Sequence, residues 1–205
     1  MNLETVIRER RSIRKFRDQE VPGELLEEII GKALWAPSGM NRQDWHIVVA
    51  KGGIRDRLAE TVQGAKARMR SRMEGLSFPE KIINMTLQFF DDFGGAPVVV
   101  LVYITRETYS FDERMGRKER YHLEFKRYNC LLSAAAFIQT FLLAACSRGL
   151  GTCWMTGPKY MEDEINSLLG ISGDKELVSI IPVGYPDQTP PAPPRKVNSV
   201  QWIGF

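Results

Sequence analysis

One stretch of ten residues restricts the fold more than any other part of the chain. Residues 96–105 read APVVVLVYIT, an almost unbroken apolar run rich in β-branched side chains. A strand with one face in water alternates apolar and polar residues, whereas a continuous run indicates a strand buried on both faces. We therefore expect a central strand in a sheet that other elements cover on both sides.

Two helices are predicted beside this strand. Residues 22–36 begin with Pro22 and carry glutamates near the positive end and an apolar stripe, which indicates an amphipathic helix. Residues 125–148 give the longer helix, and Gly149 stands where a left-handed cap belongs. Because apolar residues surround most of its circumference, this helix is expected at the centre of the molecule or in a subunit interface.

Shorter patterns complete the fold class. WHIVVA and LVSIIPVGYP predict strands, and residues 162–169 predict a helix. Residues 55–93 have a polar helical pattern interrupted by Gly75 and Pro79, so we expect two or more helices there, with Arg55 exposed. The 205 residues fit one domain, 1–205. The class is α+β or mixed α/β.

The last twenty residues differ from the rest of the chain. Residues 190–194 read PPAPP, which forbids a helix and favours an extended connector. The final VQWIGF is too apolar to stay in water, so we expect it to pack on something.

Several classes of site are disfavoured by the sequence. Three cysteines and two histidines without metal-ligand spacing disfavour disulfides and a metal site, and suit a reducing cytosol. The N-terminus lacks the pattern of a secretory signal, so a cytoplasmic location is expected. No P-loop occurs, and Gly149–Gly151 lacks the third glycine of a dinucleotide fingerprint. No nucleophile elbow occurs, and a pair of Cys153 with His46 or His122 has no local signature, so no catalytic side chain is assigned.

The segment RERRSIRKF, residues 8–16, gathers five cationic side chains in a chain of net charge +3. It fits a face for nucleic acid, a solvated helix end or a pocket for one phosphate. A nucleic-acid face fits poorly because acidic residues nearly balance the basic ones over the whole chain.

The order of four blocks favours the phosphate. RRSIRKF is followed by VPGELLEEIIGKALWAPSGMNRQDWHIVVA, then GLGTCWMTG, and finally PPRK. In this order and spacing the chain resembles the nitroreductase family of FMN-dependent oxidoreductases, over nearly its whole length. The resemblance implies a nitroreductase-like α+β sandwich with a central mixed sheet flanked by helices and a long buried helix. It also implies a homodimer that exchanges C-terminal strands, with two FMN sites at the interface.

The resemblance also implies site residues. Arg10, Arg11 and Ser12 match the N-terminal block that holds the FMN phosphate and ribityl chain, and Arg195 with Lys196 matches a cationic pair that closes over the phosphate. Arg14 matches a cation beside the flavin N1 and O2 edge, where it favours the reduced, charged form. A loop reaching the flavin from the other subunit matches Pro37, Ser38, Gly39, Met40 and Asn41, and the segment along the ring matches Trp154, Met155, Thr156 and Gly157.

The implied reaction passes hydride from NAD(P)H through flavin N5 to a nitroaromatic, a quinone or a similar small acceptor. No nucleic acid or membrane is expected as a partner. A flavin-binding storage or sensing protein, and another flavin reaction on the same scaffold, remain alternatives. The sequence departs from the family pattern at Asp44, where proline is common, and Asn84 is an uncertain match for a ring-binding polar residue. Residues 106–125 correspond to a variable segment whose aromatic side chains Tyr109, Phe111, Tyr121 and Phe125 line a pocket or cover the core.

Overall fold

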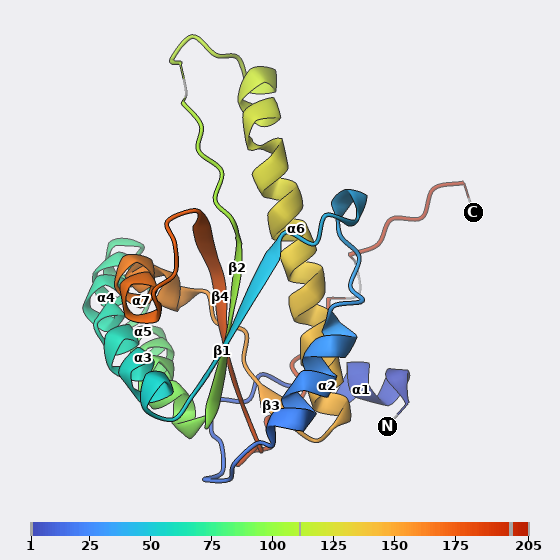
Figure 1. The fold of residues 1–205 in the computed structure, drawn as a ribbon, viewed down its shortest axis with the longest axis vertical. Helices are drawn as coiled ribbons and strands as arrows, with labels where there is room; N and C mark the ends of the chain where they lie inside the picture. Colours follow the sequence, from blue (N-terminus) through green and yellow to red (C-terminus); the bar gives the residue numbers. More distant parts are fainter. Residues whose placement is uncertain (1, 111, 197–198, 205) are drawn as a thin grey trace.

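The computed structural model describes residues 2–110, 112–196 and 199–204, and has an α+β fold in which helices lie on both sides of one sheet (Figure 1). Phe111, Val197, Asn198 and Phe205 lie outside the described residues, as does Met1. The helices are α1 (Leu3–Glu9), α2 (Gly23–Ala33), α3 (Gly53–Gln63), α4 (Ala65–Gly75), α5 (Glu80–Leu87), α6 (Arg117–Ser147) and α7 (Glu162–Leu169). Four short 3-10 segments are η1 (Gly39–Asn41), η2 (Gln88–Phe90), η3 (Asp92–Gly95) and η4 (Gly157–Met161).

The sheet has the order β1 (Trp45–Lys51), β2 (Val98–Thr105), β4 (Lys175–Gly184), β3 (Gly151–Thr152). β2 is the predicted central strand, with Leu101 opposite Val48 on one side and Ile180 on the other. All pairs of these strands are antiparallel. Among the described residues parallel pairing occurs only at the isolated bridge between Ser12 and Thr152, so the expected mixed sheet is antiparallel in its four strands.

Burial of both faces explains the continuous apolar sequence of β2. Its side chains alternate between two cores, with Val99, Leu101 and Tyr103 in one and Val98, Val100, Val102 and Ile104 in the other. The first core lies under α3, α4 and α7, and the second under α2 and α6, on the opposite side of the sheet (Figure 1). An antiparallel strand here has the composition more common in parallel sheets, because helices cover both of its faces.

Helix α6 is longer than predicted and is buried along one face only. It begins at Arg117, where the Gly116 N–H donates to Glu119 Oε2 at 2.6 Å. It ends before Gly149, whose φ of 77° confirms the left-handed cap. Buried residues such as Phe137 and Phe141 pack on the sheet. Its most apolar 18 residues have a mean hydropathy of 1.9, enough for a membrane span by composition, but 44% of that window is buried inside the fold, as in a core helix.

Residues 55–93 form α3, α4 and α5, as the interruptions predicted. Gly75 ends α4 and Pro79 caps α5, whereas the break between α3 and α4 at Gly64 had no clear signal. Arg55 is buried, so the expectation of an exposed side chain is wrong. Its guanidinium donates to the Ala96 carbonyl oxygen at 2.7 Å and forms an ion pair with Asp92. Both partners are distant from Arg55 in the sequence. They pair a guanidinium group that the sequence alone predicted to be exposed to solvent.

Candidate functional site

Arg8 and Glu9 of the cationic segment end helix α1, and residues 10–16 are extended and lie against the sheet. Ile13 N donates to Thr152 O at 2.9 Å, and Phe16 N donates to Gly94 O at 3.0 Å. Ile13 and Phe16 are buried in the core, whereas Arg14 is exposed. The two apolar side chains therefore anchor a segment whose Arg14 and Lys15 side chains are exposed.

Two glycines allow this close approach. A β-carbon at Gly94, whose φ is 69°, would overlap the carbonyl oxygen of Arg14. A β-carbon at Gly151 would lie 2.8–2.9 Å from three carbons of the Ile13 side chain. Any larger residue at either position would push the segment away from the sheet.

A cavity of about 690 Å³ lies beside Arg14 on the face of the sheet covered by α4 and α5. Met155 fixes one wall, because its N–H donates to Ile180 O and its carbonyl accepts from Ile180 N, both at 3.0 Å. A β-carbon at Gly157 would overlap the Phe90 ring, so the chain and the ring approach as closely as they do only with glycine there. The lining residues are mostly apolar or aromatic: Met69, Phe90, Cys153, Trp154, Met155, Pro158 and Tyr160, with Arg14, Arg72, Thr86, Thr156, Gly157 and Lys159.

A second cavity, of about 230 Å³, lies at the other end of the cationic segment and is lined by Arg10 and Arg11 together with Glu9. A narrow hollow of about 10 Å³ lies between the two. It shares Ile13 with the second cavity and Arg14 with the first. The three cavities therefore follow one extended segment, with cations at one end and aromatic walls at the other.

The Arg10 and Arg11 end of this row is suited to an anion. Arg11 Nη1 donates to two backbone carbonyls, but its buried Nε has no acceptor among the described residues. In that part of the chain neither Arg10 nor Arg11 forms an ion pair. A buried donor without a partner is uncommon and marks a place where a bound acceptor would be stabilised.

Cys153 lines the first cavity and the narrow hollow, and its environment favours the neutral thiol. Burial raises the pKa of its thiol, and the opposing effect of Arg14 is smaller. Neither His46 nor His122 is among the described residues that line these cavities. Cys153 packs as a neutral side chain.

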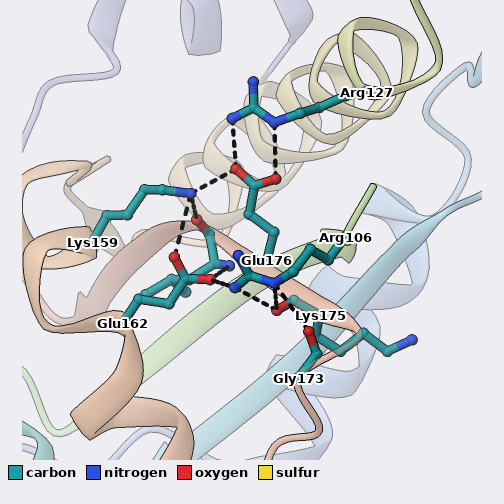
Figure 2. A network of polar contacts seen from close by, with 8 residues as sticks. Arg106, Arg127, Lys159, Glu162, Gly173, Lys175 and Glu176 are labelled. Carbon is teal, nitrogen blue, oxygen red and sulfur yellow. Dashed lines mark hydrogen bonds and ion pairs between the residues drawn. The ribbon is translucent and has the colours of Figure 1, made fainter. Parts of the chain in front are cut away.

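A network of charged residues borders the first cavity and is drawn in Figure 2. The Glu176 carboxylate accepts two hydrogen bonds from Arg127, at 2.9 and 2.6 Å, and one from Lys159 at 2.7 Å. These cations, Arg127 first, lower the pKa of Glu176 to about 2. Lys159 also donates to Leu177 O at 2.8 Å, and Glu162 accepts from Arg106 at 2.5 Å. The network ties α6, β4, η4 and α7 together behind the cavity wall.

The predicted loop at residues 37–41 lies elsewhere. Gly39 N donates to Ser133 Oγ of α6 at 3.2 Å, which places the loop on the α2 and α6 side of the sheet. Met40 has a φ of 55° and is 95% exposed. Pro37, Ser38, Gly39, Met40 and Asn41 are therefore on the opposite face from the cavity in the same chain. Asp44, the departure from the family pattern, pairs with Arg42 at 2.8 Å.

The C-terminal cations Arg195 and Lys196 are not among the described residues that line the second cavity. Gln188, Thr189 and Pro190 line the second cavity, but Arg195 and Lys196 beyond them are exposed. Arg195 donates to the carbonyl oxygen of Pro193 at 3.4 Å.

Several residues of the cavity were missed by sequence reasoning. Met69, Arg72, Thr86 and Phe90 come from the region 55–93, whose helices were predicted without an orientation. Asn84 lies outside the cavity and accepts from Arg70 at 2.6 Å on the exposed side of α5. Tyr121 and Phe125, on α6, are about half exposed and neither line this cavity nor cover the core.

Comparisons with known proteins agree on one family. The model described as "Nitroreductase family" matches residues 7–185. A protein of Methanothermobacter thermautotrophicus named "Putative NADH dehydrogenase/NAD(P)H nitroreductase" is 30% identical, over 93% of this chain and 80% of its own length.

Solved structures have the same fold. A BluB-like flavoprotein from Clostridium difficile is 29% identical, with a TM-score of 0.79 over 99% of both chains. The FMN-dependent nitroreductase NfnB from Mycobacterium smegmatis, solved in complex with NADPH, has a TM-score of 0.69 over 93% of both chains. At 23% identity the second is a likeness of fold alone.

Proposed function

The chain belongs to the nitroreductase family, and from this premise we propose that it is an FMN-dependent oxidoreductase that uses NAD(P)H to reduce a small acceptor such as a nitroaromatic or a quinone. The observation that carries the proposal is the row of cavities along residues 10–14, cationic at one end and aromatic at the other. FMN has the matching chemistry, with a phosphate dianion at one end and a flat ring at the other.

Arg10, Arg11 and Ser12 hold the phosphate in this proposal. Two guanidinium groups beside one dianion form charge-assisted hydrogen bonds, each worth about 1.5–3 kcal/mol. The unpaired buried Nε of Arg11 is a donor ready for such a bond. Arg195 and Lys196 close over the phosphate from the C-terminal segment, which passes the second cavity at Gln188 to Pro190.

The larger cavity would hold the isoalloxazine ring, between Arg14 and residues 154–157. When bound, FMN supplies the redox chemistry, because its ring accepts a hydride from NAD(P)H and passes two electrons to the acceptor. Arg14 stabilises negative charge at one edge of the ring. The segment Trp154, Met155, Thr156 and Gly157 lies along it, fixed to the sheet by the two Met155–Ile180 hydrogen bonds. No acid or base pair from the protein is required for this reaction.

A second copy of the chain completes the site. The loop at residues 37–41 lies across the sheet from its own cavity, so it can reach a flavin only in a partner. Helix α6 supports such an assembly, because Tyr121, Phe125, Tyr128 and Leu132 form an exposed apolar stripe at helical spacing, with Leu132 69% exposed. The described tail is also apolar and exposed at Val200, Trp202 and Ile203, as expected of a segment that packs on the partner's sheet.

The proposed location is the cytoplasm. Cys130, Cys146 and Cys153 are free thiols, which suits a reducing compartment.

The experiment is spectroscopic. Protein purified from cells should be yellow, release FMN on denaturation, and lose its visible flavin absorption when NADH or NADPH is added without oxygen. Addition of a nitroaromatic or a quinone should then restore the absorption. Yellow protein that neither nicotinamide reduces would indicate a flavin-binding protein without turnover, and protein that cannot be reconstituted with FMN would refute the proposal.

A further inference from the structure

The first cavity, the larger one of about 690 Å³, has an excess of positively charged side chains in its lining. Three cations, Arg14, Arg72 and Lys159, line it, and no aspartate or glutamate is among the described residues that do so. An excess of positive charge in a cavity attracts an anionic ligand. The three cations differ in the hydrogen bonds and ion pairs that they already form within the protein.

The Lys159 ammonium already has partners within the protein. Its ammonium donates to Glu176 at 2.7 Å and to Leu177 O at 2.8 Å, and lies 3.5 Å from Glu162, as Figure 2 shows. These contacts use the three donors of an ammonium group. Arg14 belongs to the segment that we assign to the flavin ring. Neither residue is left to recognise a second molecule.

Arg72 is in a different situation from its neighbours on α4. Arg68 donates to Tyr160 O at 2.9 Å and pairs with Glu164, and Arg70 pairs with Glu80 at 2.9 Å. Within the described part of the chain the Arg72 side chain has no carboxylate partner. Its guanidinium carbon lies over the Tyr160 ring, 5.5 Å from the ring centre.

A cation–π contact places a guanidinium over an aromatic ring without using its hydrogen-bond donors. Such an arginine can still bind a carboxylate or a phosphate through two parallel N–H bonds. Arg72 and Tyr160 line the same cavity as Met155, Thr156 and Gly157. Arg72 is therefore presented at the same cavity as the proposed ring site.

We propose that Arg72 is a specificity-determining residue that receives the anionic group of the second ligand, which enters beside the flavin. This rests on the proposed function and adds the substrate class to it. The favoured ligand is an aromatic acceptor that carries a carboxylate. The 2′-phosphate of NADPH has the same chemistry and is the other source of such an anion.

Binding of benzoate and benzamide tests the proposal, because the two have the same ring, differ in charge, and are not reduced. Isothermal titration of the purified, FMN-loaded protein should show benzoate binding at least about ten-fold weaker in Arg72→Gln than in wild type, with benzamide changed by less than about two-fold. Arg72→Lys should retain part of the preference. Arg57→Gln is the matched control, since Arg57 is exposed on α3 and does not line this cavity.

A second measurement identifies the source of the anion. The ratio of KM values for NADH and NADPH is compared between wild type and Arg72→Gln. A selective rise in the KM for NADPH supports the same subsite with the 2′-phosphate of NADPH as its ligand. If benzoate affinity and the KM ratio are both unchanged, including the case in which benzoate binds to neither protein, the assignment of Arg72 is wrong. Flavin content, measured first in each variant, shows separately whether the proposed function itself has failed.

Discussion

Gly94 lies so close to Arg14 that a β-carbon at this position would overlap the Arg14 carbonyl oxygen. The contact joins the turn before β2 to the segment that we assign to the flavin. The residue at position 94, far from Arg14 in the sequence, therefore helps to determine where Arg14 lies.

Substitution of Gly94 tests this contact. Gly94→Ala adds a side chain at a φ of 69° and displaces the Arg14 backbone, so we expect a loss of at least about 2 kcal/mol in the free energy of unfolding, together with weaker FMN retention. Urea denaturation and the flavin content of the purified protein measure the two effects. Gly31→Ala is the control, because a β-carbon there meets nothing within 4 Å. Equal behaviour of both variants would show that the contact is unimportant.

Removal of one phosphate-binding cation should weaken FMN binding. We expect Arg10→Gln and Arg195→Gln each to raise the Kd for FMN by about ten-fold or more, because each loses a charge-assisted hydrogen bond. Fluorescence titration of the flavin-free protein measures the Kd. Arg57→Gln is the control, since the buried Arg55 is unsuitable for that purpose. A Kd for Arg10→Gln equal to that of the control would exclude Arg10 from the phosphate site.

A charge in the exposed stripe of α6 should separate the subunits. Leu132→Glu places a carboxylate in a surface that we propose to be buried in the dimer, so we expect a monomer that has lost its flavin. Light scattering after gel filtration measures the mass, and absorbance measures the flavin. Leu76→Glu, at a residue 61% exposed beyond α4, should remain a yellow dimer. A monomeric Leu132→Glu protein with full FMN occupancy would contradict the placement of the site at the interface.

The Glu176 network predicts a pH dependence of stability. Folding lowers the pKa of Glu176 from 4.5 to about 2, so the carboxylate stabilises the fold above pH 4.5, and this contribution is lost as the pH falls toward 2. We expect Glu176→Gln to lower the free energy of unfolding by about 2–3 kcal/mol at pH 7 and by much less near the folded pKa. Urea denaturation of both proteins at neutral and acidic pH measures the difference. The exposed Glu60→Gln should show no comparable trend, and a constant difference for Glu176→Gln would refute the prediction.

The sequence predicted those elements of the fold whose cause lies within a few neighbouring residues. The apolar run of β2, the Gly149 cap and the interruption of the helical pattern at Pro79 each have their signal within a few positions, and each is confirmed. The antiparallel register of β2 was not predictable, because pairing with β1 and β4 depends on strands distant in the chain.

The same distinction applies to the site. Residues 10–14 and 154–157 were recognised as compact motifs, and the structure brings Arg14 and residues 154–157 to one cavity. Arg72 was missed because α4 is mostly polar and carries several arginines, so no local pattern shows which of them faces a wall formed by η4. The burial of Arg55 was missed because Asp92 and the Ala96 carbonyl create it.

The larger cavity is assembled from two parts of the chain whose supports differ. Met155 is hydrogen-bonded to β4, whereas Met69 and Arg72 belong to α4, which Arg70 ties to α5 through Glu80. Substitutions at Met69 and Arg72 should therefore change which molecules the cavity admits, while the Met155–Ile180 hydrogen bonds keep the proposed flavin segment in place. Directed evolution of this protein toward new acceptors should begin with a library at these two α4 positions.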